Sequence, residues 1–205
     1  MTTEPDARLL NWRFVAPSQP PELLLLSADG ETVPGALTPD RDVFDHPLPA
    51  LRYPAIAIPD LAAWLPRRRP AGAARLLAGL AAAVAPGGWL CAGFANSWYP
   101  VVPLRPGSLS CARALRTVRR AGLTRTELYA ALPGPRRAAF LVPLARPAEM
   151  DHMLRVLFET SYPGRGRGAA AARRMLSLLR RAALTAPHAR RRLVPAYYLV
   201  ARRPR

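Results

Sequence analysis

The stretch VAPGGWLCAGF, residues 84–94, decides the fold of this chain. In the segment that precedes it, residues 71–85, leucines recur at helical spacing with alanines between them, which predicts a helix. Pro86 and the two glycines after it then predict the stop of that helix at a glycine cap. The apolar run Trp89–Phe94 predicts a buried strand. The stretch therefore predicts a helix, an abrupt end and a strand of the central sheet.

Two further strands are predicted on the amino-terminal side of this stretch. The apolar run in residues 22–28 is typical of a strand covered on both faces, and residues 52–60 predict a second strand that ends at a proline. Asp60 is a suitable cap for a helix that begins at Leu61 and runs to Leu65. Residues 29–52 carry no helical pattern, and we expect loops there with one short strand near Val43 and Phe44.

The carboxy-terminal side continues the alternation of strands and helices. Ser108 or Ser110 is suited to cap a helix that runs through Ala121 and ends at Gly122. The remaining predicted elements are strands at residues 124–132, 140–144 and 194–201 and helices at residues 147–158 and 169–184. This order predicts one α/β domain with a mainly parallel sheet and right-handed crossovers.

Several ordered motifs resemble the back half of class I S-adenosylmethionine-dependent methyltransferases. They are the strand AIPDL (57–61), the turn VAPGGWL (84–90), the segment FANSWY (94–99), the hairpin entry RRAGL (119–123), the strand ELYAALP (127–133) and the closing strand YLVAR (198–202). The resemblance covers roughly 150 residues from Tyr53 onward. It implies a truncated Rossmann-like methyltransferase sheet, mostly parallel with a carboxy-terminal antiparallel part and helices on both faces.

The resemblance also divides the single domain, residues 1–205, into three parts. Residues 1–52 correspond to an eroded cofactor-side segment, residues 53–144 to the sheet core, and residues 145–205 to a helical insert and the closing strand. The family's first strand ends in a glycine-rich turn whose amides approach the cofactor, whereas residues 27–35 hold two glycines five apart and a proline. The cofactor site is therefore predicted to be degenerate.

The resemblance assigns candidate roles to eight residues. The candidates for S-adenosylmethionine are Ser27, Asp29, Gly30, Asp60 and Leu61, and the candidates for the substrate are Asn96, Trp98 and Tyr99. The second group follows a predicted strand at the carboxyl edge, where open α/β sheets bind ligands. The alternative for that group is a loop whose aromatic rings pack over the sheet.

No residue is predicted to be catalytic. His46, His152 and His188 have no acid or nucleophile at a recognisable spacing, and no pattern of cysteine and histidine predicts a metal site. Two functions therefore stay open. One is methyl transfer from S-adenosylmethionine to a small molecule or biosynthetic intermediate. The other is that of a pseudoenzyme that binds no cofactor and binds or stabilises a partner in a bacterial biosynthetic pathway.

The charge of the chain changes sign along its length. Residues 1–60 hold nine acidic residues and four arginines, and residues 61–205 hold 26 arginines and four acidic residues. A solvated arginine-rich surface is the simpler interpretation, and the others are a bound anionic partner or an acidic amino-terminal part that lies against the basic carboxy-terminal part. A protein partner or a homo-oligomer is a further prediction. A nucleic acid or an anionic membrane surface is the weaker alternative for the arginines from Ser161 onward. The acidic, polar start and the two cysteines, Cys91 and Cys111, predict a reduced cytoplasmic protein.

Overall fold

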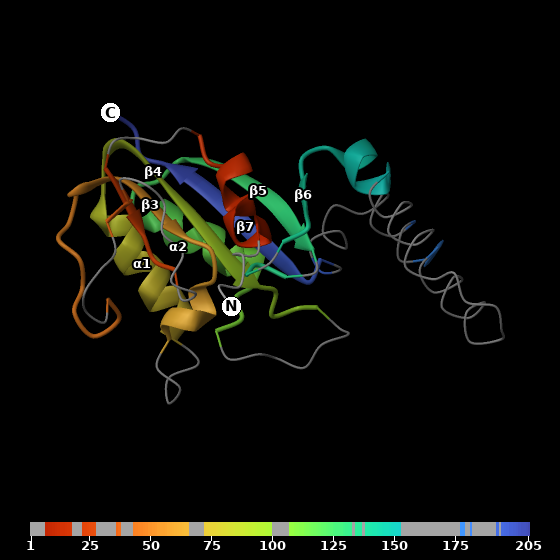
Figure 1. Cartoon of the computed structure of the whole chain (residues 1–205), viewed down its shortest axis with the longest axis horizontal. Coiled ribbons are helices and arrows are strands. Elements are labelled where there is room, and N and C mark those ends of the chain that lie inside the picture. Colours follow the sequence, from red (N-terminus) through yellow and green to blue (C-terminus); the bar gives the residue numbers. More distant parts are fainter. Residues whose placement is uncertain are drawn as a thin grey trace, which may run out of the picture.

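The computed structural model contains one seven-stranded sheet in the order β2-β1-β3-β4-β7-β5-β6 (Figure 1). It describes residues 7–17, 22–27, 36–37, 43–65, 72–99, 107–132, 134–136, 138–152, 177–178, 181, 192 and 194–205. The strands are β1 (Leu23–Leu25), β2 (Ala36–Leu37), β3 (Tyr53–Ile58), β4 (Val84–Ala95), β5 (Arg125–Leu132), β6 (Phe140–Pro143) and β7 (Ala196–Arg202). The helices are η1 (Ala7–Phe14), η2 (Leu61–Trp64), α1 (Ala73–Ala83) and α2 (Cys111–Arg120), of which η1 and η2 are 3₁₀ helices.

Strand direction divides the sheet into two parts. Strands β2, β1, β3 and β4 are parallel to one another, with Leu23 opposite Ala55 and Ala55 opposite Trp89. Strand β7 lies between β4 and β5 and is antiparallel to both, and β6 forms an antiparallel hairpin with β5. The predicted fold class is confirmed in its arrangement: the sheet is mostly parallel with a carboxy-terminal antiparallel part.

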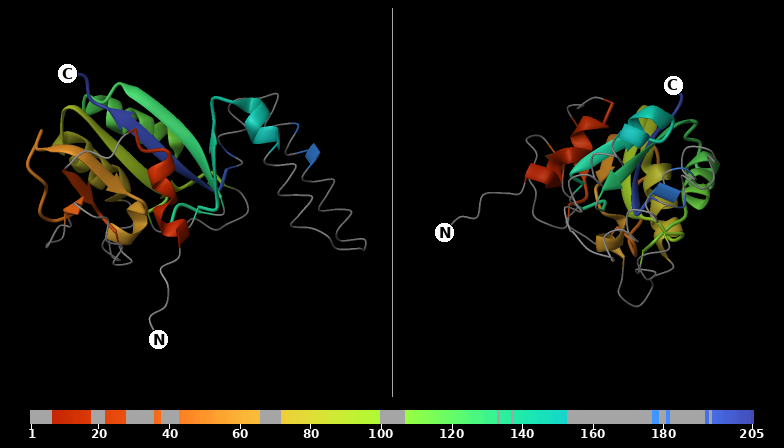
Figure 2. Two further views of the ribbon diagram at one scale, coloured as in Figure 1. Left: turned by 45° about the horizontal axis from the view of Figure 1, so that its top comes forward. Right: turned by 90° about the vertical axis from the view of Figure 1, so that its right-hand side faces the viewer.

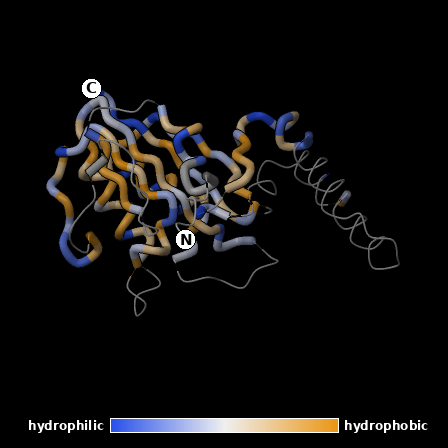
Figure 3. Tube along the Cα trace, in the orientation of Figure 1, coloured by the Kyte–Doolittle hydropathy of each residue, from blue (hydrophilic) through white to orange (hydrophobic). Residues whose placement is uncertain are grey.

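Helices cover both faces of the sheet, because apolar side chains alternate between its two sides. On one face, α1 and α2 pack against the cluster that contains Ile56, Ile58 and Leu90. On the other face, Trp12 of η1 packs in a second cluster with strand residues such as Leu25. Figure 2 shows η1 and α2 on opposite sides of the sheet, and Figure 3 shows hydrophobic residues concentrated along the central strands.

The helix ends agree with the predicted caps at α2 but not at α1. The Ser110 side chain accepts a hydrogen bond from the Arg113 backbone N–H, and Gly122 follows the helix with a φ of 88°. Helix α1 instead ends at Ala83, so the glycine cap predicted after Pro86 is wrong. Gly87 lies within β4, where its φ of 75° turns the strand and its N–H donates to the Pro204 carbonyl at 3.1 Å.

One position in the central strand β4 must be a glycine, because the backbone next to it leaves no room for a side chain. A Cβ atom on Gly93 in β4 would lie 1.9 Å from the carbonyl oxygen of Pro59, at the end of β3. No real carbon atom approaches a backbone oxygen so closely. Gly93 therefore lets the chain turn from β3 into η2 directly against β4.

The main difference from the predicted elements lies before β3. Val43 and Phe44 form part of a turn, so the strand predicted there is wrong, and the short strand is β2 at Ala36–Leu37. Both residues are buried, because Phe44 packs under α1, with the Arg75 guanidinium 5.2 Å from its ring centroid. Residues 147–152 are helical as predicted. Most of the other predicted helix, residues 169–184, lies outside the described residues.

Candidate functional site

The predicted site residues follow three neighbouring parallel strands, whose carboxyl ends meet at one edge of the sheet. Ser27 comes after β1, Asp60 and Leu61 come after β3, and the segment from Asn96 to Tyr99 comes after β4. The strand order thus brings the predicted cofactor and substrate positions to a common edge, which is where open α/β sheets bind ligands. Asp29 and Gly30 lie outside the described residues.

Asp60 and Leu61 serve the local fold. The Asp60 carboxylate oxygen Oδ1 accepts a hydrogen bond from the Ala62 backbone N–H at 3.1 Å and so caps η2. The Leu61 side chain is fully buried in the cluster that faces α1. The side chain of Leu61 is therefore part of the core, and one oxygen of the Asp60 carboxylate is engaged by the backbone.

Trp64, which the sequence did not single out, closes the end of β1. Its indole N–H donates a hydrogen bond to the Leu26 carbonyl oxygen at 3.1 Å, and the Leu26 N–H donates to the Ala57 carbonyl at 2.8 Å. A tryptophan six residues after the end of β3 was the available signal, but its partner lies 38 residues earlier in the sequence. This hydrogen bond joins η2 to the residue that directly follows β1.

Asn96 joins β4 to the start of β7. Its carboxamide nitrogen donates to the Val194 carbonyl at 2.8 Å and to the Tyr197 hydroxyl oxygen at 3.2 Å. Its oxygen Oδ1 accepts from the Trp98 backbone N–H at 3.0 Å. The side chain is buried, and buried polar groups in proteins are normally satisfied in this way. Asn96 thus holds the loop in place, and the contacts in the structure use both of its amide atoms.

Trp98 is the predicted substrate residue that faces solvent. Its side chain is 55% exposed, and the Arg192 guanidinium carbon lies 4.6 Å from its ring centroid. A guanidinium at this distance is attracted electrostatically to the negative face of the indole. Tyr99 is half-buried, and its backbone N–H donates to the Asn96 carbonyl at 3.3 Å. At this edge the exposed Trp98 ring and the Arg192 guanidinium therefore form a cation–π pair.

The described residues at this edge form no cradle of backbone amides for S-adenosylmethionine, and residues 28–35, where the resemblance puts it, lie outside them. The fold family would need backbone amides at the end of the first strand for the methionine end of the cofactor. In this chain the carbonyl of Leu26 receives the Trp64 indole, one oxygen of Asp60 caps η2, and Leu61 points into the core.

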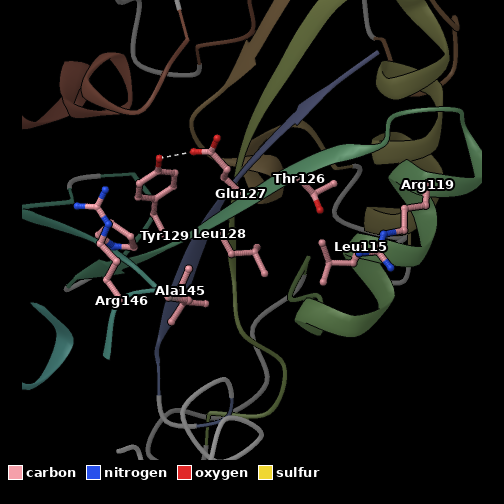
Figure 4. A pocket seen from close by; sticks show the side chains of 10 residues that line it. Leu115, Arg119, Thr126, Glu127, Leu128, Tyr129, Ala145 and Arg146 are labelled. Carbon is pink, nitrogen blue, oxygen red and sulfur yellow. Dashed lines mark hydrogen bonds between the residues drawn. The ribbon is translucent and has the colours of Figure 1, made fainter. Parts of the chain in front are cut away.

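A pocket of about 500 Å³ lies elsewhere, at the outer edge of β5 (Figure 4). Its lining residues include Leu115 and Arg119 of α2, Glu127, Leu128 and Tyr129 of β5, and Arg146 after β6. We call it the β5-edge pocket. The sequence signal for it was Glu127, which is one of only four acidic residues after residue 60. Its walls come from segments that are up to about 30 residues apart, so no local motif marks it.

One hydrogen bond dominates the polar side of the β5-edge pocket. The Tyr129 hydroxyl donates to the Glu127 carboxylate oxygen Oε2 at 2.6 Å. Burial, together with this hydrogen bond and the negative charge of Glu127, raises the pKa of Tyr129 to about 12. The Arg146 guanidinium pairs with the Glu149 carboxylate at 2.7 Å, which raises the pKa of Arg146 further. At neutral pH the phenol of Tyr129 is therefore neutral, and it lies beside the Glu127 side chain in a pocket that Arg119 and Arg146 also line.

The described part of the chain contains no metal site or membrane span. No group of three histidine, cysteine, aspartate or glutamate residues comes together within it to hold a metal ion. None of its helices has the length and apolar character needed to cross a bilayer. Cys91 and Cys111 are both buried and form no disulfide, and burial raises the pKa of Cys91 to about 12.

Comparisons with known proteins find similarity only among solved structures. No family model matches the sequence, and no curated protein matches it. The [4+2]-cyclase SpnF is 14% identical over 82% of this chain and 56% of its own, with a TM-score of 0.38. Phosphoethanolamine N-methyltransferase 2 of Haemonchus contortus, in complex with phosphomonomethylethanolamine and S-adenosylhomocysteine, is 10% identical over 83% of this chain and 38% of its own, with a TM-score of 0.40.

A candidate sarcosine dimethylglycine methyltransferase from Galdieria sulphuraria is similar to the same extent. It is 12% identical over 83% of this chain and 60% of its own, with a TM-score of 0.37. This chain thus spans between 38% and 60% of the length of these three proteins. Because every TM-score is below 0.5, the architecture is described by the strand order and strand directions of the chain itself.

Proposed function

We propose that this chain is a methyltransferase-like protein that binds or stabilises a protein partner and does not itself transfer a methyl group. The observation that carries the proposal is the hydrogen bond from the Trp64 indole to the Leu26 carbonyl. It spans the end of β1, where the resemblance puts the methionine end of the cofactor. A ligand site needs a few polar groups that are directed at the ligand, and here the Leu26 carbonyl is engaged by the protein itself.

The contacts on the substrate side of the edge support the same function. The Asn96 carboxamide is held by Val194, Tyr197 and Trp98, so a small-molecule substrate would have to replace contacts that anchor β7. Breaking buried hydrogen bonds without an equivalent replacement costs about 1–3 kcal/mol for each group. The Asn96 side chain at this edge therefore stabilises the adjoining loop, and a ligand would bind there only at the expense of these hydrogen bonds. A cytoplasmic location and a biosynthetic pathway stay predictions.

Methyl transfer from S-adenosylmethionine to a small molecule is the second candidate function. It is favoured by one observation, the common edge at which Ser27, Asp60 and Trp98 follow adjacent parallel strands. Under this alternative, Asp29 and Gly30 border the cofactor and the exposed ring of Trp98 contacts the substrate.

Calorimetric titration of the whole chain with S-adenosylmethionine and S-adenosylhomocysteine separates the two functions. The proposal expects no saturable heat with either compound. The Trp64→Phe variant, which keeps an aromatic ring but removes the indole donor, is expected to behave like the parent. Binding with a Kd on the order of micromolar, lost in Asp29→Ala or Gly30→Val, would overturn the proposal and establish the second candidate.

A further inference from the structure

The β5-edge pocket contains side chains from both faces of one strand. Thr126 and Leu128 point to the face of the sheet that α2 covers, and Glu127 and Tyr129 point to the opposite face. A hollow that is lined by both sets lies in the plane of the sheet, beside the strand rather than above it (Figure 4). An occupant of this hollow would continue the sheet.

The hollow exists because β6 leaves β5 halfway along. Strand β6 pairs only with Tyr129–Leu132, and the last bond of the ladder runs from the Leu144 N–H to the Leu128 carbonyl. The chain then turns, with the Arg146 N–H donating to the Pro143 carbonyl at 3.2 Å, and the helix at residues 147–152 begins. Within the described ranges, no strand pairs with the outer side of the first half of β5.

The alternation of an antiparallel ladder determines which backbone groups face the hollow. In such a ladder every second residue directs its N–H and C=O to the same side. Because the Leu128 carbonyl points toward Leu144, the N–H and C=O of Thr126 point to the same outer side. Exposed strand edges of this kind are templates for another strand.

The side chains around the hollow are apolar in the middle and basic at the rim. Leu115 and Leu128 form its floor, with Arg119 one helical turn after Leu115 on α2. Residues 111–126 contain five arginines and no acidic residue. The one carboxylate of the lining, Glu127, accepts the hydrogen bond of Tyr129. The complementary occupant therefore has acidic residues beside an apolar one.

We infer that the first half of β5 docks a short extended segment of a protein partner, which adds to the sheet beside Thr126 and carries acidic residues toward the arginines of α2. The inference rests on the proposed partner-binding function and names its surface. The unpaired first half of β5 is about three residues long, so an added strand could pair with it over roughly 10 Å. With so few backbone bonds the segment is expected to bind with a Kd on the order of 10–100 μM.

A labelled peptide with alternating glutamate and valine, eight residues long, is the probe. Its binding to the whole chain is measured by fluorescence anisotropy. The control is a peptide of the same length and charge in which alternate valines are replaced by proline. Each replacement removes a backbone N–H that could join a ladder, so this peptide is expected to bind at least tenfold more weakly. Equal binding of the two peptides would mean attraction by charge alone and would overturn the inference.

Two variants test the edge and the charge separately. Thr126→Pro removes the outward N–H, a change that edge strands tolerate, and is expected to abolish binding of the valine peptide. Arg119→Glu is expected to weaken it at least fivefold, whereas Arg116→Glu, the same change on the same helix outside the pocket, has a smaller effect. Thermal unfolding shows whether each variant is folded. Equal effects of Arg119→Glu and Arg116→Glu would contradict the assigned surface.

Two outcomes distinguish this inference from the function on which it rests. If a concentration-dependent dimer forms and Thr126→Pro abolishes it, the occupant is a second copy of the chain and the inference is wrong, while the partner-binding function stands. If S-adenosylmethionine binds in the calorimeter, the proposed function fails, whatever the peptide does. Sedimentation equilibrium of the parent and of Thr126→Pro gives the first result.

Discussion

Asn96 shows how one side chain at the sheet edge connects segments about a hundred residues apart. Its carboxamide bonds to Val194 and Tyr197 before and within β7, while its oxygen orders the next turn through Trp98. The donors and acceptors match the amide group, which carries two N–H donors on one side and a carbonyl on the other. The identity of the residue is therefore important, and not only its size.

The Asn96→Asp substitution tests this requirement. It replaces the N–H donors by an oxygen that faces the carbonyl oxygens of Arg192 and Val194, so we expect the free energy of unfolding to fall by roughly 2–4 kcal/mol. Chemical denaturation of the variant gives the value. Trp98→Ala leaves the bonded backbone N–H in place and is expected to cost at most about 1 kcal/mol. Comparable losses in the two variants would contradict the role of the carboxamide.

Cys91 gives a prediction for alkaline pH. Burial raises the pKa of this thiol from its ordinary value of 9.0 to about 12, so the folded state holds the proton more tightly than the unfolded state. Its contribution to stability is therefore complete below pH 9 and is lost as the pH rises toward 12. Unfolding free energies measured across this range should fall more steeply for the parent than for Cys91→Ala. Parallel curves would show that the thiol does not titrate with folding.

At the scale of elements, the junction of β3 with β4 depends on the absence of a side chain. Gly93 has the Pro59 carbonyl where a Cβ atom would be, whereas Gly79 in α1 has no atom within 4 Å of that position. We expect Gly93→Ala to cost more than about 3 kcal/mol because backbone must move. Gly79→Ala should stabilise the helix by up to about 1 kcal/mol. Thermal unfolding of both variants measures the contrast, and a stable Gly93→Ala protein would refute the close approach.

The elements that the sequence predicted well are those with a strong local signal. The apolar runs at Tyr53–Ile58 and Ala196–Arg202 and the serine before α2 each specify a structure within a few residues. The short strand was placed at Val43 and Phe44 because these residues are apolar, but they are buried by packing under α1. A two-residue strand such as β2 has too little sequence to carry a signal of its own.

The candidate site was predictable in position but not in contacts. That the residues after β1, β3 and β4 share an edge follows from the parallel order alone. The bonds of Trp64 to Leu26 and of Asn96 to Val194 depend on side chains meeting across 38 and 98 residues, which no local pattern encodes. The β5-edge pocket was missed for the same reason, since its walls come from α2, β5 and the turn after β6.

At the scale of the whole molecule, the sheet lies between two apolar clusters, and different elements cover each of them. Two helices shield one face, and on the other face Trp12 of η1 packs against the sheet with 2% of its side chain exposed. Phe14, two residues later on the same helix, is 84% exposed. Among the side chains of η1 that the structure describes, Trp12 is therefore the one that covers the second face.

A matched pair of variants tests this dependence. Trp12→Ala is expected to lower the free energy of unfolding by about 3–5 kcal/mol, since it leaves a large cavity against the sheet. Phe14→Ala removes a ring of similar size from the surface and should change it by less than about 0.5 kcal/mol. Denaturant unfolding followed by circular dichroism measures both. A small loss in Trp12→Ala would mean that other segments cover this face.

The position of β7 has a consequence for the order in which the molecule is assembled. It is the last described strand in the sequence, yet it lies between β4 and β5 and pairs with both. During synthesis, the β5–β6 hairpin therefore has no place in the sheet until translation has passed Arg202. Until then the nascent chain carries two open edges with apolar faces, which are the conditions that favour mispairing and chaperone binding. Completing the sheet during synthesis therefore requires the insertion of a strand into a gap rather than the addition of one at a border.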